Sequence, residues 1–404
     1  MTSPVSARPG FSPALARRRA AIFTVMLVVG TGTASWVVRT PAVRDLLQAS
    51  TAEMGLVLFG ISVGSMTGVL SSAGVVRRHG ARRTIGAGGA TFVLGVALIG
   101  AAAPMSSSAG AFAGLALVGF GIGLSEIAIN VEGAALEAAS GRRVLPVLHG
   151  CFSLGTVVGA VVGVGLTALD TPVPWHLGGV AVVGAVAVAW AVPAIPSDTG
   201  RAVPGAGGGP GWRTQLGLWR QRRIVALGVI VLALALAEGS ANDWLPLIMV
   251  DGHGVSATLG SVVFTGFAAA MTVGRFAGEP LLARFGNAAV LRASALVSAV
   301  GIAVVVFSDS ALLAGCAVVL WGLGAALGFP VTLSAAADSD DPTSSVATVA
   351  VAGYLAFLVG PPLLGFLGEH LGLRAAMVVV LVVVAAASLL TSAARPRDPA
   401  AADR

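Results

Sequence analysis

Two carboxylic acids stand within apolar stretches of this sequence, and each is followed four residues later by an asparagine. Glu126 precedes Asn130, and Glu238 precedes Asn242. A spacing of four residues places two side chains on the same face of an α-helix. A carboxyl group in apolar surroundings favours its neutral form, so it can load and release a proton. We therefore predict that Glu126 and Glu238 couple protons and that Asn130 and Asn242 bind a small solute.

Both acids also have a structural interpretation. A carboxyl group tied by hydrogen bonds to a neighbouring helix accounts for Glu238 as well as proton coupling does, and the same alternative stands for Glu126. Asp243 is different, because we expect it closer to the outer surface. There it either pairs with Arg39 or is simply hydrated.

The only tyrosine, Tyr354, lies three residues before Phe357 in an apolar stretch. An aromatic ring that faces a cavity can stack on a sugar, so Tyr354 is a further candidate for solute binding. The run from Gly360 to Pro362 follows directly, and we expect it to break or bend its helix.

The elements that position these residues follow from composition. Hydrophobic residues make up 56% of the 404 positions and charged residues 10%, whereas soluble globular chains carry about 25% charged residues. Such a chain cannot cover a water-facing surface, which leaves an all-α protein that crosses the membrane many times. A crossing helix needs about 20 apolar residues. Twelve stretches qualify, at about 20–38, 54–76, 84–104, 110–131, 144–168, 175–193, 224–248, 257–278, 288–308, 311–336, 346–367 and 371–393.

The orientation of the chain follows from its basic residues, because these stay in cytoplasmic loops. All 24 are arginines, and with both termini inside only Arg39, Arg44 and Arg374 fall outside. We therefore expect a multi-pass protein of the cell membrane with cytoplasmic N- and C-termini. Three tryptophans fall at expected outer ends, where indoles anchor at the interface: Trp36, Trp175 and Trp244.

The two halves of the sequence resemble each other. A shift of 206 residues brings Arg78 onto Arg284 and Gly80 onto Gly286. A stretch rich in proline and glycine at 194–222 divides the spans six and six, and its composition is typical of a flexible linker. We expect an N-terminal half at 1–193, this linker, and a C-terminal half at 223–404.

Two six-span halves in parallel repeat are the architecture of major facilitator transporters, and the sequence resembles that superfamily along nearly its whole length. The loop after the second span, AGVVRRHGARR, resembles the superfamily's G-x-x-x-D-R-x-G-R-R signature, although Arg77 occupies the acidic position. In the superfamily this loop helps to latch one conformation, while arginines that merely hold the loop inside are an equal alternative here. The resemblance implies gating roles for Arg77, Arg78, Gly80, Arg275, Arg284 and Gly286. Arg275 can instead form a surface pair with Glu279, four residues on.

From the fourth span onward the sequence is similar to the fucose permease-like branch. Glu126 and Asn130 match an acid and an asparagine in that branch, and FSLG at 152–155 matches the start of its fifth span. Fucose carriers also use an acid in the first span, and none stands between Gly30 and Val38 here.

We therefore expect a proton-coupled secondary transporter that moves a small solute such as a sugar by alternating access, acting in the lipid bilayer as a monomer. A proton-antiport exporter of drugs or metabolites is the alternative, and a non-transporting membrane sensor is a third. A largely apolar cavity with two acids would favour export of lipophilic cations. No sequence motif indicates an enzyme, a cofactor, a metal site or ATP binding. The arginines follow membrane topology, so we expect no nucleic-acid partner.

Overall fold

The computed structural model describes residues 12–142, 144–201 and 217–396, and every regular element in these ranges is a helix. The N-terminal part contains α1 (Pro13–Val37), α2 (Thr40–Leu47), α3 (Thr51–His79), α4 (Ala81–Ala102), η1 (Ala103–Met105), α5 (Ser108–Ser140), α6 (Leu145–Ala168), α7 (Val173–Ala191) and η2 (Val192–Ala194). The C-terminal part contains α9 (Arg222–His253), α10 (Ala257–Phe307), α11 (Ala311–Ala325), α12 (Gly328–Ala337), α13 (Pro342–Leu371), α14 (Leu373–Ala387) and η3 (Ser388–Ala394).

The helices account for the twelve expected spans. Within the described ranges, 11 helices are long and apolar enough to cross a membrane. The longest, α10, contains two of the expected spans, because Gly286 with φ of 74° and ψ of 165° turns the chain between them. A positive φ favours glycine, which has no Cβ to clash with the backbone. The prediction of an all-α membrane protein with twelve spans is thereby confirmed.

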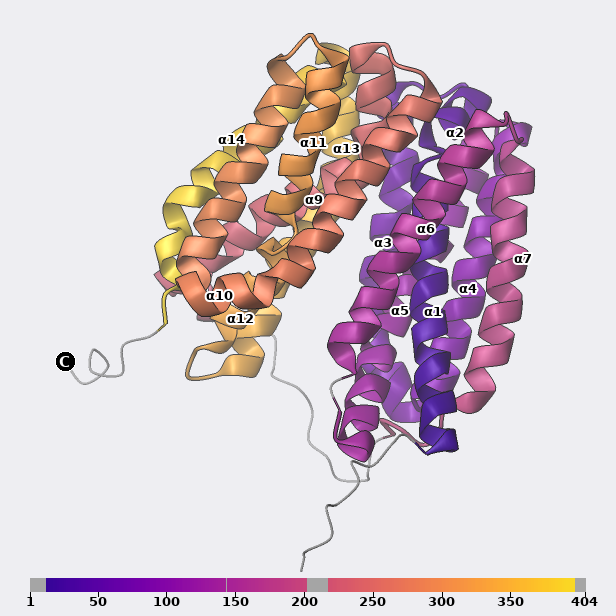
Figure 1. Cartoon of the computed structure of the whole chain (residues 1–404), viewed down its shortest axis with the longest axis vertical. Coiled ribbons are helices and arrows are strands. Elements are labelled where there is room, and N and C mark those ends of the chain that lie inside the picture. The colour runs from indigo at the N-terminus through magenta and orange to yellow at the C-terminus, as the bar shows by residue number, and fades with distance from the viewer. Residues whose placement is uncertain (1–11, 143, 202–216, 397–404) are drawn as a thin grey trace, which may run out of the picture.

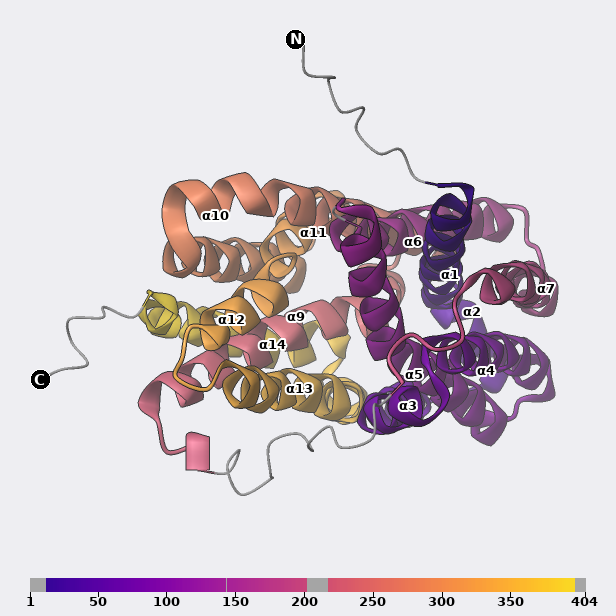
Figure 2. The ribbon, with the colours of Figure 1, turned by 90° about the horizontal axis from the view of Figure 1, so that it is seen from below.

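The helices form two bundles (Figure 1). One contains α1 to α7, and the other contains α9 to α14. Two pairs of helices make most of the contacts between them: α3 with α13, and α6 with α10. Figure 2 shows the bundles side by side, with α3 next to α13. These pairs join the second span to the eleventh and the fifth to the eighth, as a two-fold relation between the halves requires.

The two ends of the molecule differ. At one end, which we call the α2 end, Arg44 of α2 forms a salt bridge with Asp251 of α9. Ser261 Oγ of α10 donates to the carbonyl of Val38 at 3.0 Å, again across the bundles. Toward the other end, where α1 begins and η3 finishes, the ribbons of the two bundles diverge (Figure 1). We call this the terminal end.

The proline run was expected to break or bend its helix, and of these two outcomes the break does not occur. Pro361 and Pro362 both lie inside the continuous helix α13. Proline removes the N–H that would bond to the carbonyl four residues earlier, and for Pro361 that carbonyl belongs to Phe357. Ser62 Oγ of α3 donates to this carbonyl at 2.6 Å. A hydroxyl from the other bundle thus replaces the missing backbone donor, as helices inside membranes permit.

Glycine ladders hold the N-terminal bundle together. A Cβ added to Gly60 would lie 2.5 Å from the carbonyl oxygen of Phe112 on α5, and one at Gly155 would lie 2.3 Å from that of Leu27 on α1. The backbones of α3 and α5, and of α1 and α6, therefore touch, as small residues allow between membrane helices. These contacts lie within one bundle, so they pack its helices against one another.

The start of the expected linker packs on the N-terminal bundle. The N–H of Ala81 donates to the carbonyl of Thr199 at 2.8 Å, at the junction between α3 and α4. Gly200, with φ of 76°, fits against Val76 and Val131. Residues 202–216 of the linker lie outside the described residues.

Candidate functional site

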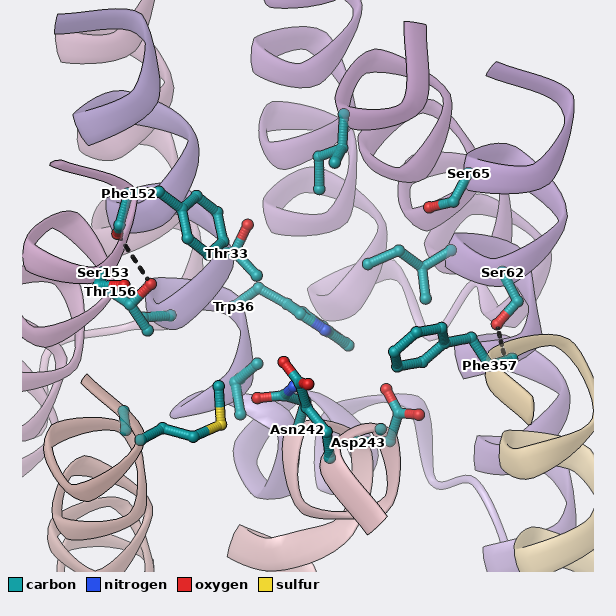
Figure 3. Close-up of a pocket in the computed structure, with 18 of the residues that line it drawn as sticks. Thr33, Trp36, Ser62, Ser65, Phe152, Ser153, Thr156, Asn242, Asp243 and Phe357 are labelled. Carbon is teal, nitrogen blue, oxygen red and sulfur yellow. Dashed lines mark hydrogen bonds between the residues drawn. The ribbon is translucent and has the colours of Figure 1, made fainter. Parts of the chain in front are cut away.

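A cavity of about 300 Å³ lies between the two bundles. Its walls come from α1, α3, α5 and α6 of one bundle and from α9, α10 and α13 of the other. In Figure 3, Asn242 and Asp243 project from α9 into the same space as Trp36 and Phe357. The lining is mostly apolar, and its polar members are Thr33, Trp36, Ser62, Ser65, Glu126, Ser153, Thr156, Glu238, Asn242, Asp243, Thr272, Arg275 and Tyr354.

Four of the lining residues carry formal charges. Glu238 and Arg275 form a salt bridge with Arg275 Nη2 2.9 Å from Glu238 Oε1, which joins α9 to α10. Glu126 on α5 and Asp243 on α9 have no salt bridge or side-chain hydrogen bond within the part of the chain that the structure describes. The cavity therefore holds one internally neutralised pair and two unpaired carboxyl groups, one from each bundle.

All three threonine hydroxyls that line the cavity already donate to backbone carbonyls. Thr33 donates to the carbonyl of Val29 at 2.8 Å, and Thr272 donates to that of Ala268 at 2.8 Å. Thr156 likewise bonds the carbonyl four residues earlier at 3.1 Å. A solute in this cavity meets these hydroxyls chiefly as hydrogen-bond acceptors, since each has a single proton to donate.

The predicted solute ligand Asn130 does not line the cavity. It lies one helical turn beyond Glu126, where its Nδ2 donates to the carbonyl of Glu126 at 2.9 Å. Its Oδ1 lies 3.1 Å from Nε2 of His149 on α6. Because the amide nitrogen faces the backbone carbonyl, its oxygen faces the histidine, whose Nε2 is then the donor. Asn130 therefore joins α5 to α6 next to the cavity.

The family model described as Major Facilitator Superfamily matches this chain over residues 22–352 and again over residues 235–404. The chain belongs to the major facilitator superfamily. The fold, the two six-span halves and the position of the cavity agree with this membership.

Relatives with known sequences or structures extend this result. An uncharacterised MFS-type transporter of Yersinia pestis is 28% identical over 372 residues, which cover 91% of this chain and 92% of the relative. A mutant of the nucleoside transporter NupG shares the fold with a TM-score of 0.76 at 12% identity, over 94% of this chain and 99% of its own. The transporter FucP in its outward conformation shares the fold with a TM-score of 0.66 at 17% identity, over 95% and 100% of the two chains.

The structure places the other predicted site residues of this superfamily member as follows. Glu126, Glu238, Asn242 and Tyr354 all line the cavity. Arg275, which was predicted to pair with Glu279 at the surface or to act in gating, also lines the cavity. There it forms a salt bridge with Glu238 of α9. Glu238 is the acid with a structural partner, as its alternative interpretation expected.

The loops that carry the superfamily signature share one backbone shape. Gly80 has φ of 82° and ψ of 164° between α3 and α4, close to the values of Gly286 inside α10. Arg77 and Arg78 are exposed at the end of α3. Arg284 stacks over the ring of its neighbour Phe285, with the guanidinium carbon 5.2 Å from the ring centre.

Sequence reasoning placed two of the cavity residues at the outer surface. Asp243 was expected near the surface, but α9 runs on to His253, so Asp243 lies ten residues inside the helix and reaches the cavity. Trp36 was expected at the membrane interface, yet it is only 2% exposed and lines the cavity. The short helix α2, which follows α1 directly, covers this end of the bundle. The sequence offers one indication that Asp243 lies near the cavity, because its neighbour Asn242 is predicted to bind the solute.

Proposed function

We propose that this protein is a proton-coupled secondary transporter that moves a small solute through the central cavity by alternating access. The observation that carries the proposal is the pair of unpaired carboxyl groups, Glu126 and Asp243, in one cavity between the two bundles. An ionisable group inside a membrane protein normally faces a water-filled path and takes part in ion or substrate movement.

Alternating access is supported by the contrast between the two ends. Contacts at the α2 end cross between the bundles: Arg44 with Asp251, and the backbone N–H of Ala52 with Glu369 at 3.1 Å. If both termini are cytoplasmic, as the arginine distribution predicts, the closed end faces outward. We propose that this structure is the inward-facing state in the cell membrane and that breaking these contacts opens the outer side.

We assign the coupling protons first to Glu126 and Asp243, since neither carboxylate forms a salt bridge with any residue that the structure describes. Glu238 stays a prediction as a coupling residue. A proton on its carboxyl group would weaken the salt bridge and release Arg275, so protonation there would be linked to a movement of α9 against α10.

Two solute classes fit the cavity. A small sugar fits the rings of Tyr354 and Phe357, together with hydroxyl and amide groups that can bond to it. Export of a drug or metabolite by proton antiport fits the apolar lining and the two unpaired carboxyl groups. Growth of a deletion strain on single sugars, compared with its sensitivity to toxic compounds, separates uptake from export.

The test of proton coupling uses the full-length protein in liposomes with a pH-sensitive dye inside. An imposed solute gradient should drive proton movement in the wild type and leave the dye unchanged in Glu126→Gln and Asp243→Asn. Asp170→Asn makes the same chemical change in an exposed turn and should behave as wild type. Proton movement that persists at the wild-type rate in both cavity variants would refute the proposal.

A further inference from the structure

The charges of the cavity point to the charge of its solute. We infer that the solute is a small organic cation, a protonated amine, held by Glu126 of one bundle and Asp243 of the other and enclosed by aromatic rings. This inference rests on the proposed transport role of the cavity and narrows the chemical class of what is carried.

The first argument is charge balance. Arg275 is the only basic residue among the described residues that line the cavity, and it is already bound to Glu238. A carboxylate solute would meet two carboxyl groups and no free cation. An ammonium group supplies the positive charge that both carboxylates lack, and it can displace the protons they otherwise carry.

The second argument is the count of donors and acceptors. The hydroxyls of Thr33, Thr156 and Thr272 donate to carbonyls of their own helices, so they offer lone pairs to a solute. Ionised carboxylates only accept. These hydroxyls and the two unpaired carboxylates therefore offer acceptors to a solute, and an ammonium group with three N–H donors complements them.

The third argument is the aromatic wall. Six aromatic side chains line the cavity: Trp36, Phe152, Phe264, Phe267, Tyr354 and Phe357. The faces of aromatic rings attract cations, and this attraction is stronger where water is excluded. Figure 3 shows Asp243 in the same space as Trp36 and Phe357, so one amine can reach a carboxylate and a ring together.

The arrangement also links binding to movement. Glu126 belongs to α5 and Asp243 to α9, which lie in different bundles. A cation that contacts both carboxylates draws the bundles together around it, whereas a proton bound to one carboxyl group cannot bridge them. Exchange of protons for the cation then changes which arrangement of the bundles is favoured.

The test compares three probes of nearly equal size that differ in charge. Binding of cyclohexylammonium, cyclohexanol and cyclohexanecarboxylate to the purified full-length protein is measured by calorimetry at neutral pH. We expect the ammonium to bind at least about tenfold more tightly than the alcohol, and the carboxylate not to bind. Equal or tighter binding of the alcohol or the carboxylate, or no binding of any probe, overturns the inference.

Two variants and one control locate the effect. Asp243→Asn and Glu126→Gln keep the shape of each side chain, and each should reduce the preference for the ammonium over the alcohol by about tenfold. Asp170→Asn should keep the wild-type preference. An undiminished preference in both cavity variants, with both proteins folded by thermal unfolding, overturns the inference.

The same titrations separate this inference from the proposed proton coupling. Repeating them in buffers of different ionisation enthalpy counts the protons released on binding. A preference for the ammonium without proton release would support a cationic solute and refute coupling through these acids. Proton release together with equal binding of the ammonium and the alcohol would support coupling through these acids and refute a cationic solute.

Discussion

The two bundles share one plan but place their close glycine contacts at different positions. In the N-terminal bundle, Gly60 and Gly64 bring α3 against the carbonyls of α5, with added Cβ atoms 2.5 and 2.0 Å from backbone oxygens. In the C-terminal bundle the repeat partner of Gly60 is Gly266, which has open space where a Cβ would stand. The equivalent helices there approach closely at Gly322 of α11, where an added Cβ would lie 2.6 Å from the carbonyl oxygen of Phe267, and Phe267 also contacts Trp321 edge-on at 5.8 Å.

The charged residues of the cavity lining are also divided unevenly between the two bundles. The N-terminal bundle buries Glu132 and pairs it with Arg18 away from the cavity, so Glu126 is its one charged group in the cavity lining described here. The C-terminal bundle contributes Asp243 and the Glu238–Arg275 pair. The C-terminal bundle therefore supplies three of the four charged groups in the cavity lining.

The largest effect should come from adding a methyl group to the glycine ladder. Gly60→Ala should destabilise the protein by about 1–3 kcal/mol, because the new Cβ overlaps the carbonyl of Phe112. Gly266→Ala makes the same change at the repeat position and should be neutral or stabilising by up to about 1 kcal/mol, since alanine favours helices and the space is open. Thermal unfolding of both variants decides the matter. Equal losses in the two would contradict the packing difference.

The next effect concerns the charges of the C-terminal bundle. Glu238→Gln leaves the Arg275 guanidinium without its carboxylate and should cost about 1–3 kcal/mol of stability. Glu126→Gln breaks no salt bridge and should leave stability nearly unchanged while it abolishes proton movement. Replacing both members, as in Glu238→Gln with Arg275→Met, should restore part of the loss. A double variant less stable than the single one would mean that Arg275 stabilises the protein through contacts other than the one with Glu238.

Much of the fold could be predicted from the sequence because the signals for it are local. An apolar run that spans a bilayer is visible in the chain itself, and so is the repeat that aligns Gly80 with Gly286, whose backbone angles agree. Glu126 could be found for the same reason, since an acid stands out in an apolar helix.

The rest of the site depends on contacts between helices. The partner of Glu238 is 37 residues away on α10, and the helix position of Arg275 suggested only its neighbour Glu279. Asp243 was misplaced because the length of α9 was underestimated. The hydroxyl of Ser62, which donates to the carbonyl of Phe357 in α13, comes from the other bundle. No residue near the proline run indicates this contact.

A smaller effect should follow from removing that hydroxyl. The repeat partner of Ser62 is Ala268, so only one of the two helix pairs that join the bundles has this hydrogen bond. Ser62→Ala leaves the carbonyl of Phe357 without a donor and should cost about 1 kcal/mol. Thr67→Ala, on the same helix, removes a hydroxyl that bonds only within α3 and should cost less. Thermal unfolding compares them, and a larger loss for Thr67→Ala would contradict this role of Ser62.

The smallest effect concerns the start of two equivalent spans, the fifth in the N-terminal bundle and the eleventh in the C-terminal bundle. In the N-terminal bundle Glu137 accepts from the backbone N–H groups of Val144 and Leu145, at 2.6 and 3.0 Å. In the C-terminal bundle Asp341 caps α13 locally by accepting from the N–H of Ser344 at 3.1 Å. Hydrogen bonds from Ser344 lower the pKa of the Asp341 carboxyl below its ordinary value of 3.8.

Because the folded-state pKa of Asp341 is lowered, its ionised form stabilises the folded protein above pH 3.8, and this stabilisation is lost as pH falls through the lowered pKa. Asp341→Asn keeps a side-chain acceptor at the cap but has no charge to interact with the helix dipole. The wild type should therefore unfold at a slightly higher temperature than the variant at pH 6, and the difference should vanish in acid. A difference that does not change with pH would mean that the charge of the cap contributes nothing, and that both bundles begin these spans through hydrogen bonds alone.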